Sequence, residues 1–266
     1  MRKILLSVCF CAGCLRPAAA GAAPAAGAGS FYPNPSNYGD FTYHALIIGV
    51  DRKVVKGSGS TCHVPYADKL AGFLKKWKCF RKGGVAALKG AEATKRRIMA
   101  AITGLRLGPK DVLVIYYGGH GDYSGIMAAG EKSISPDELF GYMRRSGAGF
   151  KVLLVSACYS GLFSDPDEEW SETPRPGFAI ATSGEESGTK TIGEVGFGPY
   201  LWKLLNLKYG GAQGAVTLGD LEGFIRAENA AWEKKGKAGL SDGRNYGPMD
   251  AVILWTEAPG RGPSIK

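Results

Sequence analysis

Short apolar runs alternate with longer amphipathic segments along most of the chain. Almost uninterrupted apolar runs are typical of strands buried on both faces of a parallel sheet, and amphipathic segments between them are typical of helices. The alternation therefore predicts an α/β layer fold with a mainly parallel sheet. Six runs are predicted as strands, at residues 44–50, 84–90, 111–117, 151–157, 177–183 and 250–255.

The segments between these runs carry the start signals of helices. Ser135, Pro136 and Glu138 have the spacing of a capping box with proline in the first turn. Thr94 and Thr217 each precede a segment with apolar residues at helical spacing, so both are predicted as caps. The predicted helices span residues 65–77, 94–105, 133–143, 198–207 and 217–233.

The first thirty residues differ from the rest of the chain. A short basic start precedes an apolar run at 4–13, and an alanine- and glycine-rich stretch follows it. This order is typical of a secretory signal, and the apolar run is too short to span a membrane. We therefore predict a signal peptide and leader at 1–30, one domain at 31–266, and export to the periplasm or the cell exterior.

Composition and charge narrow the class of partner. The chain has 266 residues, 45% of them hydrophobic, which suits one domain with a sizeable core. Its formal charge is +9 and falls to +6 without the leader, which holds three basic residues and no acidic one. The remaining charges are dispersed, as is typical of solvated helix faces. We expect no nucleic-acid partner and no transmembrane segment, and the sequence sets no oligomeric state.

Three of the six cysteines lie in the leader. Lipid anchoring at Cys14 is the less favoured alternative to a cleaved signal, because Cys11 stands where an aliphatic residue is usual. Cys62, Cys79 and Cys158 remain, and an odd number in an exported chain indicates an unpaired thiol. Cys62 and Cys79 flank the first predicted helix, whose ends are ~20 Å apart, so we predict that they do not form a disulfide.

Two predicted strands end in turns that carry reactive side chains. Gly119-His120-Gly121 follows strand 111–117, and Cys158 follows strand 151–157. The carboxyl ends of parallel strands meet at one edge of a sheet, so these turns can bring an imidazole next to a thiol. A histidine beside a cysteine supplies the base that makes the thiol nucleophilic. The two glycines are expected to allow a tight turn and to leave N–H groups facing an oxyanion.

The order of these residues excludes several classes of thiol enzyme. All three histidines (His44, His63 and His120) precede Cys158, whereas papain-like enzymes and cysteine variants of α/β-hydrolases place the nucleophile first. A nucleophile elbow needs glycine two residues either side of the nucleophile, and serine stands at both positions. A phosphatase-type cysteine needs arginine six residues later, where this chain has Ser164.

The remaining order resembles one superfamily of cysteine peptidases. The segments YYGGHG and VSACYSG, with HALIIGVD before them and AIATSGEES after them, resemble those of caspases, metacaspases and legumains. The resemblance covers roughly residues 42–256, and His120 and Cys158 are 38 residues apart. It implies a caspase-like three-layer sandwich, in which helices cover both faces of a mainly parallel six-stranded sheet.

The same resemblance assigns roles at the site. It implies that Cys158 is the nucleophile of a cysteine endopeptidase, that His120 is its partner, and that a thioester acyl-enzyme forms. The backbone N–H groups of Gly121 and Cys158 would form the oxyanion hole, and no cofactor or metal is implied. Two alternatives stay open: a catalytically silent caspase-like binding protein, and a legumain-like peptidase or transpeptidase acting after Asn or Asp. The intact dyad favours a peptidase with a peptide or protein substrate.

The substrate pocket departs from the family pattern. Ser156 stands two residues before the nucleophile, where caspases have Gln, legumains Glu and many metacaspases Asp, so any charge in the pocket comes from elsewhere. The candidate pocket residues after the fifth strand are Ser183, Glu185 and Glu186, and Arg52 follows the first strand. Two adjacent carboxylates outweigh one arginine, and we therefore predict cleavage after Arg or Lys.

Overall fold

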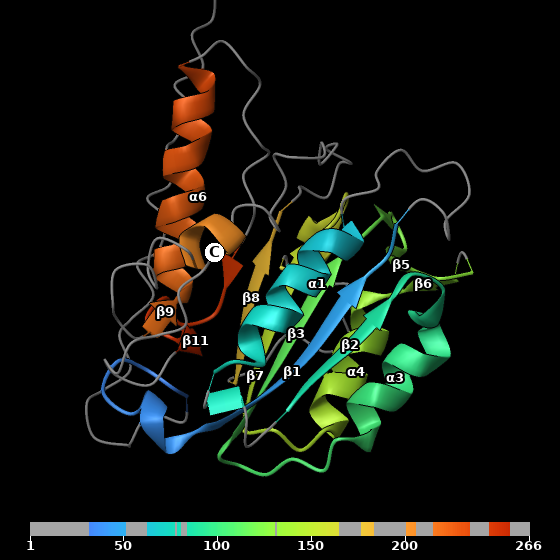
Figure 1. The fold of residues 1–266 in the computed structure, drawn as a ribbon, viewed down its shortest axis with the longest axis horizontal. Helices are drawn as coiled ribbons and strands as arrows, with labels where there is room; N and C mark the ends of the chain where they lie inside the picture. Colours follow the sequence, from blue (N-terminus) through green and yellow to red (C-terminus); the bar gives the residue numbers. More distant parts are fainter. Residues whose placement is uncertain are drawn as a thin grey trace, which may run out of the picture.

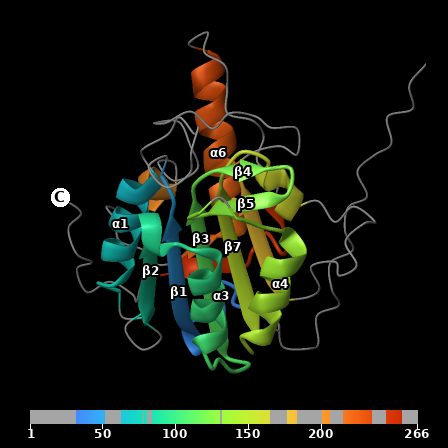
Figure 2. The same cartoon turned by 90° about the vertical axis from the view of Figure 1, so that its right-hand side faces the viewer.

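The computed structural model describes residues 32–51, 63–77, 79–80, 84–130, 132–164, 177–183, 201–205, 215–234 and 245–255. A six-stranded sheet forms its centre (Figures 1 and 2). In spatial order the strands are β10 (Asn245–Tyr246), β8 (Phe178–Thr182), β7 (Phe150–Ser156), β3 (Asp111–Gly118), β1 (Thr42–Gly49) and β2 (Val85–Lys89). Five of these strands are parallel, and β10 pairs antiparallel with β8. The predicted α/β fold with a mainly parallel sheet is confirmed.

Helices cover both faces of this sheet (Figure 1). The core on one face includes residues from α1 (His63–Leu74), from the helical residues 201–205 and from α6 (Leu218–Glu233). The core on the other face includes residues from α3 (Lys95–Gly104) and α4 (Pro136–Arg145). The shorter 3-10 helices are η1 (Tyr38–Asp40), η3 (Gly90–Glu92) and η4 (Ser160–Phe163).

Strand β3 packs against both hydrophobic cores. Val112, Val114 and Tyr116 face the core under α1, and the alternate residues Leu113 and Ile115 face the core under α3 and α4. Side chains of a strand point alternately to the two faces of a sheet, so a strand covered on both sides must be apolar at every position. The uninterrupted apolar run of the sequence therefore has a direct structural cause.

The predicted helix starts are present. Ser135 Oγ accepts a hydrogen bond from Glu138 N (3.3 Å), and Glu138 Oε2 accepts one from Ser135 N (3.3 Å), which completes the capping box. Thr94 Oγ1 accepts from Arg97 N at 3.3 Å. Thr217 Oγ1 accepts from Asp220 N at 3.0 Å. Each cap supplies a partner to an N–H group that the helix itself cannot pair.

The last predicted strand lies in a different place from the one expected. It forms β11 (Val252–Trp255), which pairs antiparallel with β9 (Ala215–Thr217) in a separate two-stranded sheet. The sixth position of the main sheet is taken by β10 instead. Gly247 follows β10 with φ of 116°, a backbone conformation that favours glycine, and it turns the chain away from β8 before β11 begins.

The strand order fixes where a site can form. The chain passes from β1 through α1 to β2 on one side, and β3 then lies on the other side of β1. The connections that leave the carboxyl ends of β1 and β3 therefore run to opposite faces of the sheet. Ligand sites of open α/β sheets lie at such a switch point. Within the described ranges, no helix has both the length and the apolar character needed to cross a membrane.

Candidate active site

The turns that carry His120 and Cys158 lie next to each other at the carboxyl edge of the sheet. The parallel pairing of β3 with β7 runs as far as Gly118 opposite Ser156, and Gly119 N donates a hydrogen bond to Ser156 O at 3.0 Å. Beyond this ladder the two turns still touch, because a methyl group on Gly121 would overlap the Cys158 carbonyl oxygen. Neighbouring strands are about 4.8 Å apart, so the imidazole and the thiol start from adjacent backbone positions.

The two glycines around His120 serve close contact rather than an unusual backbone conformation. Neither Gly119 nor Gly121 has a positive φ, so neither needs glycine for its backbone conformation. A methyl group on Gly121 would overlap the carbonyl oxygen of Cys158, and one on Gly119 would overlap the Tyr117 hydroxyl. Gly121 therefore lets the two turns touch, and Gly119 leaves room for a tyrosine below them.

Tyr117 holds the backbone of the histidine turn. Its hydroxyl lies 2.7 Å from the carbonyl oxygens of both His120 and Met127, and Met127 N donates to His120 O at 2.8 Å. The Tyr117 side chain is fully buried, and this burial raises the pKa of the phenol, so the hydroxyl keeps its proton and acts as a donor. The His120 carbonyl is thus held by two donors, the Tyr117 hydroxyl and Met127 N.

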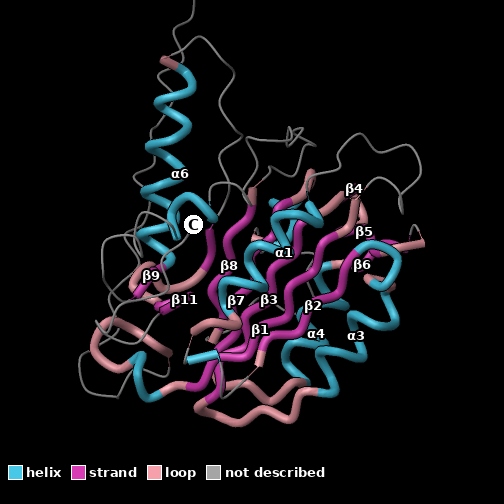
Figure 3. Tube along the Cα trace, in the orientation of Figure 1, coloured by secondary structure: helices cyan, strands magenta, loops and turns pink. Residues whose placement is uncertain are grey.

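A small antiparallel sheet, which the sequence analysis did not predict, begins directly after His120 (Figure 3). It consists of β4 (Gly121–Asp122), β5 (Gly125–Ala128) and β6 (Lys132–Ile134). The Asp122 carboxylate accepts hydrogen bonds from Ser124 N (2.8 Å) and Ser133 Oγ (3.1 Å), which ties both ends of the sheet together. This sheet anchors the far side of the histidine turn.

The cysteine turn is held by buried serines. Ser183 Oγ accepts from Ala157 N at 3.1 Å, and Ser183 N donates to Ser160 Oγ at 3.1 Å. The side chains of Ser156, Ser160 and Ser183 are buried, whereas Cys158 is partly exposed. Ser183 was proposed for the substrate pocket together with Ser156. Its hydroxyl is bonded to the backbone beside the nucleophile, where it positions the turn, while Arg52, Glu185 and Glu186 lie outside the described residues.

Tyr159, the residue after Cys158, has a strained backbone. Its φ of 55° and ψ of 16° place it in the left-handed region, and it is the one described residue other than glycine with a positive φ. This conformation costs a non-glycine residue about 1–2 kcal/mol. The strain lies directly after Cys158, at the point where the chain turns from β7 into η4.

The Tyr159 strain predicts an unusual stability order. Tyr159→Ala and Tyr159→Gly lose the same ring, but only the glycine variant relieves the left-handed conformation. We expect Tyr159→Gly to be more stable than Tyr159→Ala by about 1 kcal/mol, the reverse of the usual order for these residues. Urea unfolding of the two variants measures the difference. An alanine variant as stable as the glycine variant would show that the turn is not strained.

A second histidine, which the sequence analysis did not assign to the site, contacts His120. The rings of His63 and His120 are 5.4 Å apart between centroids and cross at 83°, an edge-to-face arrangement. His63 is the first residue of α1 and is only 8% exposed. Burial, and to a smaller extent the nearby His120, lower the pKa of His63 to about 4. His63 is therefore neutral at physiological pH.

The third histidine lies at the other end of the sheet. His44 Nε2 is 3.1 Å from Asp111 Oδ1, near the amino ends of β1 and β3. Two of the three histidines thus gather at the switch point. The sequence analysis began this helix at residue 65, two residues after His63, so it did not place His63 at the helix start.

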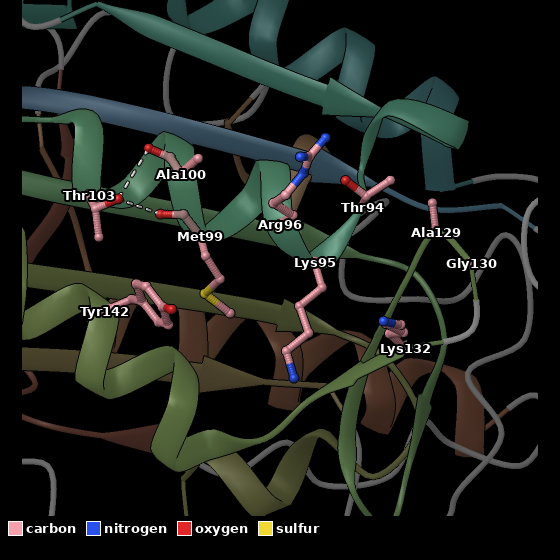
Figure 4. Close-up of a pocket in the computed structure, with 10 residues that line it drawn as sticks. All are labelled: Thr94, Lys95, Arg96, Met99, Ala100, Thr103, Ala129, Gly130, Lys132 and Tyr142. Atoms are coloured by element: carbon pink, nitrogen blue, oxygen red, sulfur yellow. Dashed lines mark hydrogen bonds between the residues drawn. The ribbon is translucent and has the colours of Figure 1, made fainter.

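An open cavity of about 720 Å³ lies elsewhere, between α3, α4 and the β5–β6 hairpin (Figure 4). Its lining includes the basic residues Lys95, Arg96 and Lys132, and Lys95 Nζ pairs with the Glu138 carboxylate at 2.7 Å. Neither His120 nor Cys158 lines it. Among the described residues, no group of three or more His, Cys, Asp and Glu side chains is placed to hold a metal ion.

Comparison with known proteins identifies the fold. No family model and no curated protein matches the chain. Caspase-1 from Spodoptera frugiperda matches with a TM-score of 0.54 and 16% identity over 82% of this chain and 92% of that one. The pro-sf-caspase-1 structure matches with a TM-score of 0.53 and 16% identity over 80% and 93% of the two chains.

A third solved structure, protein GSU0716 from Geobacter sulfurreducens, has a TM-score of 0.50 and 15% identity, and covers 81% of this chain and 100% of its own. At these identities the likeness concerns the arrangement of helices and strands. The central sheet, the helices on both of its faces and the matches to caspase-1 agree with one another. The chain therefore has a caspase-like fold.

Proposed function

We propose that this protein is a cysteine endopeptidase in which Cys158 attacks a peptide carbonyl and His120 transfers the protons. The observation that carries the proposal is the contact of the two turns, where Gly121 packs against the Cys158 backbone at the carboxyl edge of a caspase-like sheet. That edge is where parallel α/β sheets place their reactive groups. Cys158 is also partly exposed, as a residue that attacks a substrate must be.

The reaction proceeds in two steps. His120 takes the proton of the Cys158 thiol, the sulfur bonds to the peptide carbonyl carbon, and the tetrahedral intermediate expels the amine, which receives the proton from His120. The resulting thioester is attacked by a water molecule whose proton passes to His120. Collapse releases the carboxylic acid and returns the proton to the thiol.

The backbone supports an oxyanion hole at Gly121. The hydrogen bond from Met127 N to His120 O makes these two residues a hydrogen-bonded pair of the β4–β5 ladder. Gly121 and Ile126 are then a non-hydrogen-bonded pair, whose N–H groups point away from the partner strand. The Gly121 N–H is thus free of the ladder and, with the Cys158 N–H, is proposed to bind the oxyanion. One such donor is worth about 10²–10³-fold in rate.

His120 suits the role of proton carrier better than His63. The low pKa and the burial of His63 leave it unable to accept a proton near neutral pH. His120 is only partly buried and follows the strand adjacent to the one that leads to Cys158. We further propose that the enzyme acts after export, because the basic start and apolar run of the first thirteen residues are typical of a secretory signal.

The substrate residue before the cleaved bond is proposed to be Arg or Lys. Ser156 and Ser183 are neutral and buried, so a charged pocket would need Glu185 and Glu186. We expect fluorogenic peptides with Arg or Lys at this position to be cleaved at least about tenfold faster than those with Asp, Asn or Ala. The double variant Glu185→Gln/Glu186→Gln should remove most of this preference.

The same peptide set separates the alternatives. Cys158→Ala, assayed in parallel, gives the background from contaminating peptidases. Preferred cleavage after Asp or Asn, unchanged by the double Gln variant, would contradict the proposed specificity and favour a legumain-like activity. Products lengthened by an added amino-terminal peptide would indicate transpeptidation. No cleavage of any peptide by the folded protein would favour the silent binding protein.

A further inference from the structure

We propose that His63 is a positioning residue for His120, a buried neutral ring whose edge-to-face contact holds the His120 imidazole toward Cys158 and favours its protonated form. The inference rests on the proposed peptidase function. It starts from the ring contact, with centroids 5.4 Å apart and planes crossing at 83°. This geometry brings the positive edge of one ring to the negative face of the other.

The backbone of His63 is fixed before its side chain meets His120. The carboxylate of Asp51, two residues after β1, accepts hydrogen bonds from His63 N at 2.8 Å and Val64 N at 3.2 Å. Gly49 lets the first turn of α1 sit on the end of β1, because a methyl group there would lie 2.8 Å from Ala67 Cβ. Helix α1 therefore starts at one defined place, and the His63 ring has little freedom.

The strand order places His120 between its two partners. β3, which leads to His120, lies between β7, which leads to Cys158, and β1, whose carboxyl end packs against the start of α1. A histidine that carries protons must keep one ring orientation, and a contact on the side away from the thiol restricts rotation without blocking the substrate. A displacement of about 1 Å at a reacting group can cost ~10²-fold in rate.

Electrostatic repulsion and burial explain why His63, the neighbour of His120, is neutral. Two titratable groups contact His63: the Asp51 carboxylate, at its backbone, and His120, at its ring. Two imidazolium ions at this distance repel, so only one of the rings can carry the proton. Burial disfavours the charge on His63, so a proton taken from the Cys158 thiol is carried by the His120 ring. A neutral aromatic ring that presents its negative face to an imidazolium stabilises that ion further.

A purely apolar side chain could be buried at the position of His63 at a lower cost in free energy. Burying an imidazole costs free energy unless its polar atoms are satisfied, so an isoleucine or leucine would be the simpler choice for a core position. His63 is too buried to act as the proton carrier. A positioning role, exerted through the contact with the His120 ring, accounts for the identity of His63, for its burial and for its orientation.

The test compares two variants of similar size at the buried position. His63→Phe keeps a flat aromatic ring, and His63→Leu keeps the volume but removes the aromatic face. The measured quantity is the rate at which iodoacetamide alkylates Cys158 between pH 5 and 9, identified by mass spectrometry, together with kcat and KM for the best peptide. The alkylation rate reads the thiolate–imidazolium pair without requiring peptide hydrolysis.

We expect His63→Leu to slow the alkylation of Cys158 at pH 6 by about 3–10-fold, to shift its pH profile upward, and to lower kcat by a similar factor with KM little changed. His63→Phe should stay within about threefold of the original protein. Equal profiles and equal kcat for the original protein and a folded His63→Leu would overturn the inference. So would a Phe variant as impaired as the Leu variant, since the ring contact would then carry no effect.

Unfolding at different pH values tests the neutral state of His63 separately. Its pKa is lower in the folded protein than in the unfolded chain, so the unfolded chain binds more protons between about pH 6.5 and 4 and stability falls as the pH drops through this window. His63→Phe should remove that part of the pH dependence. An unchanged dependence would overturn the buried neutral state on which the inference depends.

Failure of the peptidase proposal gives a different result. If Cys158 of the unchanged protein is alkylated only at the pH of an ordinary thiol, above about pH 8, the thiolate–imidazolium pair itself is absent. That outcome refutes the dyad before His63 is altered. A normal low-pH alkylation with no effect of His63→Leu refutes the positioning role alone.

Discussion

Replacing either Cys158 or His120 with alanine should remove nearly all peptide hydrolysis, by a factor of at least about 10³, and the double variant should be little worse. The two residues act as one unit, because a thiol without its base is a weak nucleophile and a base without the thiol has nothing to activate. The measurement is kcat/KM of the three variants on the peptide that the unchanged protein cleaves best.

Two control variants come from the same residue types elsewhere in the chain. Cys79→Ala removes a buried thiol of the core, and His44→Gln removes the histidine that lies 3.1 Å from Asp111 at the other end of the sheet. Both should retain activity within a few-fold of the original protein. Full activity in either single dyad variant, or an equal loss in both controls, would refute the assignment of the dyad.

Much of the fold follows from the periodicity of the sequence. The predicted strands and the observed bounds of β1, β2, β3, β7 and β8 agree within about two residues at each end. These strands are buried on both faces, so their apolar runs are uninterrupted and easy to recognise. The helix caps were equally readable, because a side chain such as Ser135 makes its hydrogen bonds within its own turn.

The elements that were missed depend on contacts between distant segments. β4 and β6 have two and three residues, and glycine and charged side chains interrupt any apolar pattern. The β5–β6 hairpin is held by the hydrogen bond from the Tyr117 hydroxyl to Met127 and by the pairing of its two strands. Neither contact leaves a local pattern in the sequence. β11 was recognised as a strand but placed in the wrong sheet, since its apolar residues would suit either position and only the turn at Gly247 decides between them.

Candidate site residues could be predicted where they come directly after the end of a strand. His120 and Cys158 could be assigned to the same edge of the sheet because they follow two parallel strands, β3 and β7. The close contact of Gly121 with the Cys158 carbonyl oxygen could not be predicted, since the sequence shows the glycine but not the atom against it. His63 was missed because the ring contact joins residues 57 positions apart. Arg52, Glu185 and Glu186 remain predictions for the pocket.

Gly121→Ala should lower peptide hydrolysis by about 10²-fold or more while the protein still folds. The added methyl group would overlap the Cys158 carbonyl oxygen and would lie 3.3 Å from Ala157 Cβ. These neighbours include backbone, which cannot rotate away as a flexible side chain can, so the histidine turn must move from the cysteine turn. Overpacking of this kind also costs about 1–3 kcal/mol of unfolding free energy.

Gly72→Ala provides the matched control, because a methyl group there meets nothing within 4 Å and the residue lies exposed in α1. Alanine is favoured over glycine inside a helix, so this variant should be more stable by about 0.5–1 kcal/mol and equally active. Activity, urea unfolding and alkylation of Cys158 are measured on both variants. The geometry predicts that the folded Gly121→Ala protein loses hydrolysis and low-pH alkylation together. A folded Gly121→Ala variant that hydrolyses peptides within a few-fold of the original rate would mean that contact between the two turns is not what assembles the dyad.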